Sequence, residues 1–574
     1  MIAALIATTA AAGTAAAHAA AATTAASADK IPIPSIRYLA ILPPIILIGG
    51  AVILLAVASL VSRPLRVRVS TIGSVIISGG AFGISIWQWT DIRAHGAHTY
   101  IDHAVVMDGF SVLITMLVTM ALLLSALVAD GYLRREGVAG AEFHVLTLIS
   151  ASGAIVMGLS NDLILIFLGL EILSIALYVL TAFNSRRAAS GEAALKYFLL
   201  GGFSSAIFVY GIALTYGATG STNLTQIADF LSKNVVLSNG LLLAGLALLL
   251  VGFAFKVAAV PFHMWTPDVY EGAPTPVTGF MAAVAKAGAF AALLRVLISS
   301  LGVIAADWKP IIYGLAVLSL VVGSVVALRQ RDVKRMLAYS SINHAGFILL
   351  GVESATARGV SASLYYLVAY TFMTIGSFAI VTVLGREGDG DHDLTRYRGL
   401  ARRQPLLALS FAILLLAQAG APFTTGLWAK LQVVLAAISA GAVPLAAIAM
   451  VTAVIAAFFY LRVAVLMYGS DESGEPADAE VGAVAAPAGA AAGMPAAWAS
   501  PAGVAGTVTT LNAELLLAGE AAAVTGEEAP SVVPVPFLTT VAIGTCVVVT
   551  VLFGIVPAPL LDLANHASLI FVSH

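Results

Sequence analysis

The sequence predicts an all-α membrane protein with about fourteen transmembrane helices, arranged as two inverted five-helix repeats with broken helices at positions 7 and 12. Three observations support this prediction. Of the 574 residues, 60% are hydrophobic and only 10% are charged, whereas a soluble domain carries about 25% charged residues. Apolar segments of roughly 20 residues, the length that crosses about 30 Å of hydrocarbon, recur along the chain. Two of these segments are too long for one straight span, and each contains a proline.

The composition also excludes several classes of function. The formal net charge of −2 gives no sign of a nucleic-acid partner. The single cysteine, Cys546, cannot form an internal disulfide, and an iron–sulfur cluster is held by several ligands that are usually cysteines. No glycine-rich phosphate loop follows a strand pattern. We therefore expect no cofactor or metal in this chain, and we expect any redox chemistry to belong to partner subunits.

The predicted spans begin after an Ala- and Thr-rich tail at 1–37, which lacks the basic start typical of a cleaved signal peptide. The fourteen segments lie at 38–61, 70–90, 108–130, 142–160, 162–183, 191–217, 237–260, 276–300, 309–328, 333–352, 361–384, 405–438, 443–468 and 535–556. The apolar block from 142 to 183 is divided at Asn161 and Asp162.

The loop charges predict the orientation, because the side of the membrane with more Lys and Arg is cytoplasmic. The sixteen basic residues of one side are Arg63, Arg66, Arg68, Arg134, Arg135, Arg186, Arg187, Arg329, Arg331, Lys334, Arg335, Arg386, Arg396, Arg398, Arg402 and Arg403. The other side has six, which are Lys30, Arg37, Arg93, Lys233, Lys309 and Arg358. Both termini are therefore predicted to be extracytoplasmic.

We divide the chain into six parts on this basis. They are the tail (1–37), helices 1–3 (38–141), a first five-helix repeat (142–300), a second five-helix repeat (301–468), a cytoplasmic loop (469–534) and the last helix with its tail (535–574). The 469–534 loop is rich in Ala, Gly and Pro and carries nine acids and no base. Such a composition is typical of disorder.

The two long segments, 237–271 and 405–438, would each extend about 50 Å as one helix. Similar phrases interrupt them, Val260-Pro261-Phe262 in the first and Ala421-Pro422-Phe423 in the second. A proline removes a backbone hydrogen bond, and in lipid such breaks occur where protein or water satisfies the freed groups. Because the two segments are five spans apart, the repeat recurs upside down, as in many secondary transporters.

Five charged residues deep in the spans are the candidate functional residues: Glu171, Lys196, Lys256, Lys286 and Lys430. A charge at the bilayer centre costs about 2.5–3.5 kcal/mol on insertion scales, so such residues usually face protein or water and mark a pathway. Burial disfavours the charged form of lysine and glutamate, and an opposite charge restores it. Four lysines cannot all pair with one carboxylate. This favours a proton relay, in which a Glu171–Lys pair opens, over a static ion pair between helices.

Two histidines extend the candidate relay, because histidine titrates near neutrality. His344 lies midway along the tenth span and His263 lies at the first break; each alone is more often a packing residue. Asp268 and Glu271 are expected either to cap the short helix after the break or to face the cytoplasm. Ammonium groups offer no oxygen ligands, so the transported ion is predicted to be H⁺ rather than Na⁺.

Two other charges are expected to be structural. Arg295 and Arg462 lie near the predicted ends of their spans. A long side chain in such a place can extend to the membrane interface. We therefore expect both guanidinium groups to lie at the surface.

The stretch PFHMWTPDVYEGAPTPVTGFMAAVAKAGAFAALLR, together with KRMLAYSSINHAGFILLG, closely resembles the antiporter-like membrane subunits of respiratory complex I. The phrase WTPDVYEG is the form associated with N-type members rather than with their L- and M-type relatives. The resemblance covers roughly 38–468 and the last span. It implies a proton-translocating subunit of NADH:quinone oxidoreductase in a bacterial plasma membrane. It also implies FMN, iron–sulfur clusters and quinone in partner subunits, and related antiporter-like subunits as neighbours.

By this resemblance, Glu171 and Lys256 correspond to the acid–base pair of the fifth and seventh helices. Lys286 corresponds to the connecting lysine of the eighth helix, Lys196 to an accessory lysine of the sixth, and Lys430 to the terminal lysine of the twelfth. M-type members carry glutamate at that last position, and L-type members continue into a long lateral helix. The N-terminal tail and the acidic loop depart from the family. The Ala- and Gly-rich composition favours an actinobacterial source, for which menaquinone is the expected quinone.

Two alternatives remain open from the sequence. A subunit of a cation/proton antiporter or of a membrane-bound hydrogenase would share the fold and the buried lysines, and neighbouring genes for NADH-, flavin- and cluster-binding subunits would separate these cases. A purely structural membrane subunit is the other alternative. It predicts that lysine substitutions impair assembly rather than pumping.

Overall fold

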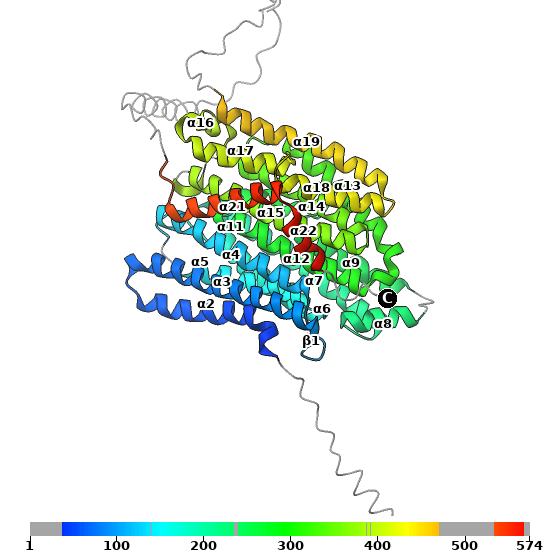
Figure 1. Ribbon diagram of the computed structural model, residues 1–574. Helices are drawn as coiled ribbons and strands as arrows, with labels where there is room; N and C mark the ends of the chain where they lie inside the picture. Colours follow the sequence, from blue (N-terminus) through cyan, green and yellow to red (C-terminus); the bar gives the residue numbers. More distant parts are fainter. Residues whose placement is uncertain are drawn as a thin grey trace, which may run out of the picture.

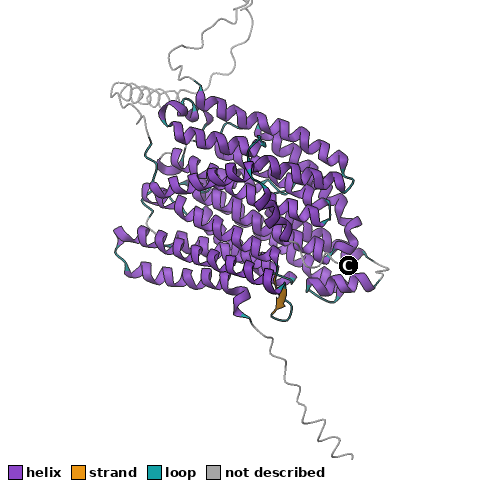
Figure 2. Ribbon diagram, in the orientation of Figure 1, coloured by secondary structure: helices purple, strands orange, loops and turns teal. Residues whose placement is uncertain are grey.

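Helices make up nearly all of the structure, a computed structural model that describes residues 37–138, 141–234, 239–385, 387–390, 392–469 and 533–567. An apolar run in hydrocarbon must satisfy its backbone hydrogen bonds internally, and a helix does so within one segment. Figure 2 shows the result, with long helices lying side by side and one short hairpin. The predicted N-terminal tail and the acidic loop lie almost entirely outside the described residues, as does the end of the C-terminal tail.

In chain order the elements are η1 (Tyr38–Ile41), α2 (Leu42–Leu60), α3 (Arg63–His95), β1 (His98–Tyr100), β2 (Val105–Met107), α4 (Gly109–Arg135), α5 (Glu142–Leu159), α6 (Leu163–Thr181), α7 (Ala188–Thr219), α8 (Leu224–Lys233), α9 (Gly240–Val257), α10 (Trp265–Gly272), α11 (Thr275–Phe280), η2 (Met281–Ala285), α12 (Lys286–Leu294), η3 (Arg295–Ser300), η4 (Gly302–Ile304), α13 (Ala305–Ala327), α14 (Val333–Glu353), α15 (Ala357–Leu384), η5 (Glu387–Asp389), η6 (Leu394–Tyr397), α16 (Leu400–Arg403), α17 (Pro405–Ala419), α18 (Thr425–Ser439), α19 (Val443–Tyr468), α21 (Phe537–Ile555) and α22 (Ala558–His566). The antiparallel hairpin pairs His98 with Met107.

The predicted segments all contain helix, and Asp162 caps the start of α6 at the predicted division between the fourth and fifth segments. Within the described ranges, 12 helical segments are long and apolar enough to cross a membrane, so the chain is a multi-pass membrane protein. The two further predicted spans correspond to α14 and to the shorter apolar helices α17 and α18. The sequence prediction missed α8, a short amphipathic helix that buries Leu224, Ile227 and Leu231.

Both predicted breaks are present. Helix α9 ends at Val257, and Ala258 then adopts a left-handed conformation with φ of 60° before the chain reaches Pro261. Helix α17 ends at Ala419, and Gly420 adopts φ of 95° just before Pro422. After each proline the chain resumes a helix, α10 in the first case and α18 in the second.

The centre of the bundle is formed by the segment α11–η2–α12–η3 and by α15. In the most apolar stretch of each, 94% of the residues are buried, whereas in the corresponding stretch of α3 only 33% are. Two π-helical turns, η2 and η3, flank α12. In Figure 1, α2 and α3 form one margin of the bundle and α19 the opposite one. The last long helix, α21, returns to pack against α4 and α15. Large apolar side chains such as Phe203 and Val454 point outward from the peripheral helices, as expected for surfaces in contact with lipid.

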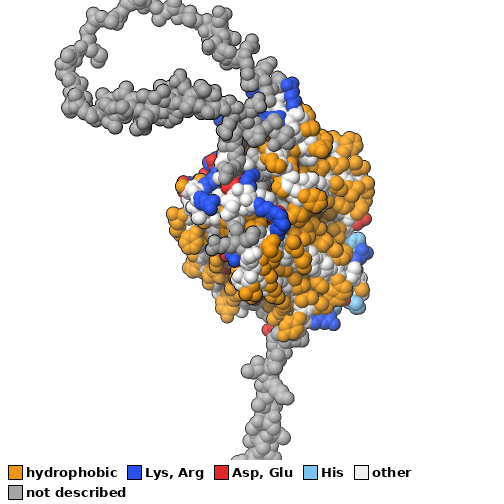
Figure 3. Space-filling view, turned by 90° about the vertical axis from the view of Figure 1, so that its left-hand side faces the viewer, with side chains coloured by type: hydrophobic (Ala, Val, Ile, Leu, Met, Phe, Trp, Pro, Cys, Tyr) orange, Lys and Arg blue, Asp and Glu red, His pale blue; other side chains and the backbone are white. Residues whose placement is uncertain are grey.

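Basic side chains gather at one end of the bundle (Figure 3). Loops predicted to share a side meet there. Asp389, fully buried, accepts hydrogen bonds from the backbone N–H and hydroxyl of Thr275, at 2.8 and 2.7 Å. It also pairs with Lys334 at 3.5 Å, His392 at 3.2 Å and Arg187 at 3.9 Å. This Asp389 cluster therefore joins the starts of α7, α11 and α14 to the loop after α15.

Candidate functional site

Glu171 lies in the middle of α6, on the face that meets α7. Its carboxylate accepts a hydrogen bond of 2.5 Å from the hydroxyl of Ser205 on α7. Among the described residues it forms no ion pair, although Lys256 lies against rings of the same two helices, α6 and α7. The structure therefore brings the predicted acid and amine near each other without joining them directly.

Lys256 lies in the last turn of α9 and is 4% exposed. Its ammonium group finds no hydrogen-bond partner among the described residues. Instead it lies 5.3 Å from the ring centroid of Tyr197, 5.5 Å from that of Tyr178 and 5.7 Å from that of Phe255. A cation within about 6 Å of a ring centroid is attracted by the ring quadrupole. Lys256 is therefore held in an aromatic environment.

Lys286 is the first residue of α12, immediately after the π-helical turn η2, and is 2% exposed. Its amine donates a hydrogen bond to the backbone carbonyl of Ser341 on α14 and lies 5.6 Å from the ring of Tyr370 on α15. The Tyr370 hydroxyl in turn donates to the Ser341 hydroxyl at 2.8 Å. The amine thus has one carbonyl acceptor and one tyrosine ring beside it inside an apolar core.

His344 lies one turn after Ser341 on α14 and is completely enclosed. Its Nδ1 lies 2.7 Å from the hydroxyl of Tyr366, and its Nε2 lies 3.1 Å from the hydroxyl of Tyr460. Its ring lies 5.1 Å from that of Tyr370, which contacts Lys286, and its partner Tyr366 stacks on Phe347, which contacts Lys430. His344 therefore has a hydroxyl at each ring nitrogen and a tyrosine neighbour on the side of each buried amine.

Lys430 lies in α18 and is 6% exposed. Its amine donates a hydrogen bond of 2.7 Å to the carbonyl of Ala419, the last residue of α17, and lies 5.0 Å from the ring of Phe347. The carbonyl end of a helix attracts a cation. The second break thus supplies Lys430 with an acceptor that an unbroken helix would use internally.

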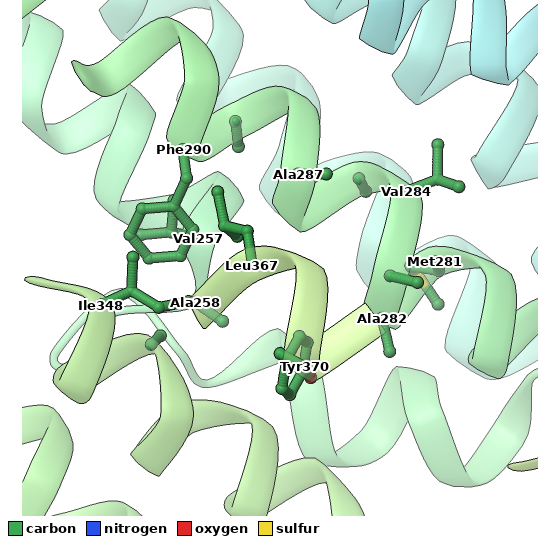
Figure 4. Packing of buried hydrophobic residues seen from close by; sticks show 14 of the residues in the cluster. Val257, Ala258, Met281, Ala282, Val284, Ala287, Phe290, Ile348, Leu367 and Tyr370 are labelled. Atoms are coloured by element: carbon green, nitrogen blue, oxygen red, sulfur yellow. The ribbon is translucent and has the colours of Figure 1, made fainter. Parts of the chain in front are cut away.

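The stretch between Lys256 and Lys286 is apolar. Figure 4 shows Val257 and Ala258, which follow Lys256, packed in one cluster with Phe290, Ile348 and Leu367 from α12, α14 and α15. No hydrogen bond between described residues links the two amines. Lys286, His344 and Lys430, with the hydroxyls beside them, form one buried polar line, although no hydrogen bond between described residues joins either amine to His344. Glu171 and Lys256 form a separate group.

Lys196 differs from the other lysines. We expected a buried amine, but its side chain is 43% exposed and pairs with Glu192 at 2.8 Å and Asp268 at 2.9 Å. Asp268 and Glu271 both pair with Arg335, at 2.9 and 2.6 Å. Burial alone would raise the pKa of Asp268, but Lys196 and Arg335 lower it below its ordinary value. These residues form a half-exposed charged cluster rather than part of the buried line.

His263 lies in the turn between α9 and α10, as predicted, and is half-buried. Its Nδ1 finds no partner within the described chain. The neighbouring Met264 is 72% exposed. Among the described residues, no side-chain hydrogen bond or ion pair joins His263 to the other predicted site residues, so it stands apart from the line.

The expectation for Arg295 was wrong. Its guanidinium is fully buried and forms two hydrogen bonds of 2.9 Å with the carboxylate of Asp108, and a third of 3.1 Å with the carbonyl of Gly158. The Arg295 side chain therefore points into the bundle, toward the start of α4 and the end of α5, and not outward. Arg462, by contrast, is exposed and donates to the carbonyl of Leu328 at 3.1 Å.

Sequence reasoning also missed the hydroxyl groups of the site: Ser205, Ser341, Tyr366, Tyr370 and Tyr460. Tyr366 and Tyr370 are spaced by four residues, so they share one helix face. Ser341 and His344 are spaced by three, with the same consequence. This spacing is the feature of the sequence from which these polar groups could have been predicted to lie together. Within the described residues, no three His, Cys, Asp or Glu side chains are grouped so that they could hold a metal ion.

Comparison with known proteins agrees with this architecture. The sequence model of the family described as NADH:quinone oxidoreductase/Mrp antiporter, TM, matches residues 160–456. NADH-quinone oxidoreductase subunit N of Trichlorobacter lovleyi is 43% identical over 393 residues, which cover 68% of this chain and 79% of the relative. The protein of that name from Acidothermus cellulolyticus is 38% identical over 563 residues, which cover 94% of this chain and 98% of the relative.

A solved structure gives the same result. A chain of respiratory complex I from Thermus thermophilus with bound aureothin matches with a TM-score of 0.70 and 30% identity, over 91% of this chain and 99% of that chain. The family model covers about half of the chain, and the relatives named above extend the likeness over most of the described helices. The chain therefore belongs to the NADH-quinone oxidoreductase subunit N family, one branch of the NADH:quinone oxidoreductase/Mrp antiporter transmembrane proteins.

Proposed function

We propose that this chain, a proton-translocating membrane subunit of NADH-quinone oxidoreductase, carries protons along a line from Glu171 and Lys256 through Lys286 and His344 to Lys430. One observation carries the proposal. The ring of the enclosed His344 lies 5.1 Å from that of Tyr370, which in turn lies 5.6 Å from the Lys286 amine, and tyrosine hydroxyls contact both nitrogens of the histidine. Buried ionisable residues in spans of this kind mark ion and proton pathways.

Each group has a role that its chemistry allows. The Glu171 carboxylate stabilises the charged form of Lys256 when the two approach each other. When they separate, the Lys256 ammonium can release its proton toward the Lys286 amine, which then becomes the charged group. The apolar side chains between them require internal water for that step. From Lys286 the proton moves to His344 and then to Lys430, with the tyrosine hydroxyls as donors and acceptors.

The half-exposed cluster of Lys196, Asp268, Glu271 and Arg335 is proposed as the proton-uptake face. It includes Arg335, one of the basic residues predicted to be cytoplasmic, and Asp268 and Glu271 from α10, the helix that follows the first break. His263, at the break itself, is proposed as an accessory carrier. In this scheme Lys196 collects protons and is not an internal carrier.

The finer architecture is also a proposal. Counting α14 and the broken pair α17–α18 as spans gives fourteen crossings, and the two left-handed breaks before Pro261 and Pro422 support inverted repeats. The basic end is then cytoplasmic and both termini are extracytoplasmic, in a bacterial plasma membrane. FMN, iron–sulfur clusters and quinone would be bound by partner subunits, and related antiporter-like subunits would be neighbours in the membrane.

The test uses the whole complex in liposomes, with NADH oxidation and proton uptake measured together. Lys256→Ala, Lys286→Ala and Lys430→Ala are each expected to lower the pumping rate by at least about tenfold, since each removes a carrier in series. The control is Lys233→Ala, which removes an exposed amine paired only with Asp229 among the described residues. Unchanged proton uptake per NADH in Lys256→Ala would contradict the relay. Loss of assembly in all three variants would favour the structural alternative.

A further inference from the structure

The facing sides of α6 and α7 place an acid and a pair of aromatic rings at two levels of one contact. On α7, Tyr197, Gly201 and Ser205 are spaced by four residues and lie above one another. Ser205 binds Glu171 at one level. Two turns away, the ring of Tyr197 meets that of Tyr178 of α6 edge to face, with centroids 4.8 Å apart. Lys256 reaches the contact at this second level.

The rings around Lys256 are fixed by their neighbours. Trp265, the first residue of WTPDVYEG, stacks on Tyr197 with centroids 4.6 Å apart and planes inclined by 11°. Its indole N–H donates a hydrogen bond of 3.0 Å to the carbonyl of Phe255, the residue before Lys256. The break therefore turns the chain back so that α10 supports the last turn of α9. The proton relay described above does not by itself require these contacts of Trp265.

Gly201 is required by the same arrangement. A Cβ atom at this position would lie 2.1 Å from the hydroxyl oxygen of Tyr178. That hydroxyl is buried and has no hydrogen-bond partner among the described residues. Only a residue without a side chain lets Tyr178 lie flat against α7 with its ring beside Lys256.

We propose that Tyr178, Tyr197 and Phe255, supported by Trp265, form a cation site that holds the Lys256 ammonium while it is separated from Glu171. Ser205 holds the carboxylate in the same arrangement. The inference rests on the proposed relay and deepens it, because it gives each charge a partner when their ion pair is open. The aromatic residues and Ser205 are positioning residues, since they act through Lys256 and Glu171.

This site makes the acid–base pair a two-position element. In one arrangement the ammonium binds the carboxylate, and in the other it binds the rings while the carboxylate binds a hydroxyl. An unpaired charge in a dry interior is costly, and attraction to rings is strongest for a desolvated cation. A small electrostatic change elsewhere in the complex can then shift the population between the two arrangements.

The decisive experiment changes the electrostatic potential of a ring face while keeping the shape of the ring nearly the same. Tyr197→Phe is expected to pump within about twofold of the wild type, because the ring face remains. Phenylalanines with increasing numbers of ring fluorines at position 197 should lower pumping in steps, to about one tenth, because fluorine removes the negative charge of the ring face. The same series at Phe208, a buried α7 residue whose ring contacts Phe253, is the control and should have no effect.

A second comparison tests the carboxylate side. Ser205→Ala should lower pumping several-fold and Ser205→Thr, which keeps a hydroxyl, should restore it; Ser204→Ala on the same helix should have no effect. If fluorination at 197 leaves pumping unchanged while Lys256→Ala abolishes it, the cation site is wrong and the relay stands. If Lys256→Ala also pumps normally, the relay is wrong as well. Equal losses at 197 and 208 would show a packing effect and overturn the cation site.

Discussion

At the scale of single residues, Arg295 and Asp108 show that a charged side chain can be fully buried when an oppositely charged partner binds it. Asp108 caps the start of α4, where its carboxylate also accepts the N–H of Ser111. The guanidinium presents two donors to that carboxylate in parallel, the strongest geometry for such a pair. The Phe110 ring lies 4.8 Å from the guanidinium carbon. Together these contacts fix the far end of the segment that carries Lys286.

Substitution of Asp108 by Asn tests this pair. The amide keeps the helix cap but leaves a buried guanidinium without its anion, and breaking a buried pair in this way costs about 3–5 kcal/mol. We expect a marked drop in the thermal midpoint of the purified complex and a lower yield of assembled enzyme. Asp108→Asn combined with Arg295→Met should cost less than the sum of the single changes. Additive effects would show that the two side chains do not depend on each other.

At the scale of elements, the break between α17 and α18 has a mechanical role for one lysine. Gly420 adopts a left-handed conformation, and a Cβ atom there would lie 3.1 Å from the Cδ atom of Lys430. The turn thus provides both the free carbonyl of Ala419 and the space for the side chain that binds it. A helix without the turn would offer neither.

Gly420→Ala and Gly441→Ala make a matched pair. Both glycines have positive φ, so alanine should cost each turn about 1–2 kcal/mol of backbone strain. At Gly441 a Cβ atom would meet nothing within 4 Å. We expect only Gly420→Ala to reduce proton pumping, several-fold, because only it displaces Lys430. Equal pumping in the two variants, measured in liposomes with NADH, would argue against the role of the turn in placing this amine.

At the scale of the whole molecule, the Asp389 cluster ties the two predicted repeats together at the basic end. It links α7 and α11 of one repeat to α14 and the loop after α15 of the other. Burial alone would raise the pKa of Asp389, but Lys334, His392 and Thr275 together hold it well below its ordinary value. The lowered pKa keeps the carboxylate charged at neutral pH.

The sign of the pH dependence follows from this shift. A group whose pKa is lower when folded contributes stability that is complete above its unfolded pKa, about 3.9 for Asp, and that is lost as the pH falls through the folded value. The difference in thermal midpoint between the wild type and Asp389→Asn should therefore be constant from about pH 8 to pH 5. It should shrink below about pH 4. A difference that already shrinks between pH 7 and pH 6 would contradict its assignment to the Asp389 carboxylate.

The sequence was sufficient for features that depend on composition and local pattern. The apolar runs gave the helices, the prolines marked both breaks, and three of the four lysines are buried as predicted, at 256, 286 and 430. Contacts between distant helices were beyond it. The partner of Arg295 lies 187 residues away, and Lys196 was misjudged because its position along α7 does not reveal which side faces outward. The tyrosines around His344 look like ordinary packing residues until α14, α15 and α19 come together.

The π-helical turn η2 has a geometric consequence for Lys286, the residue that follows it. A π turn holds one residue more than an α turn, and successive α-helical residues are rotated by about 100° about the axis. Conversion of η2 to regular α-helix would therefore swing the Lys286 side chain to a different azimuth. Arg295 stays bound to Asp108, so this rotation would fall on the nine residues of α12. A short segment could then turn Lys286 about the helix axis while its far end stays in place.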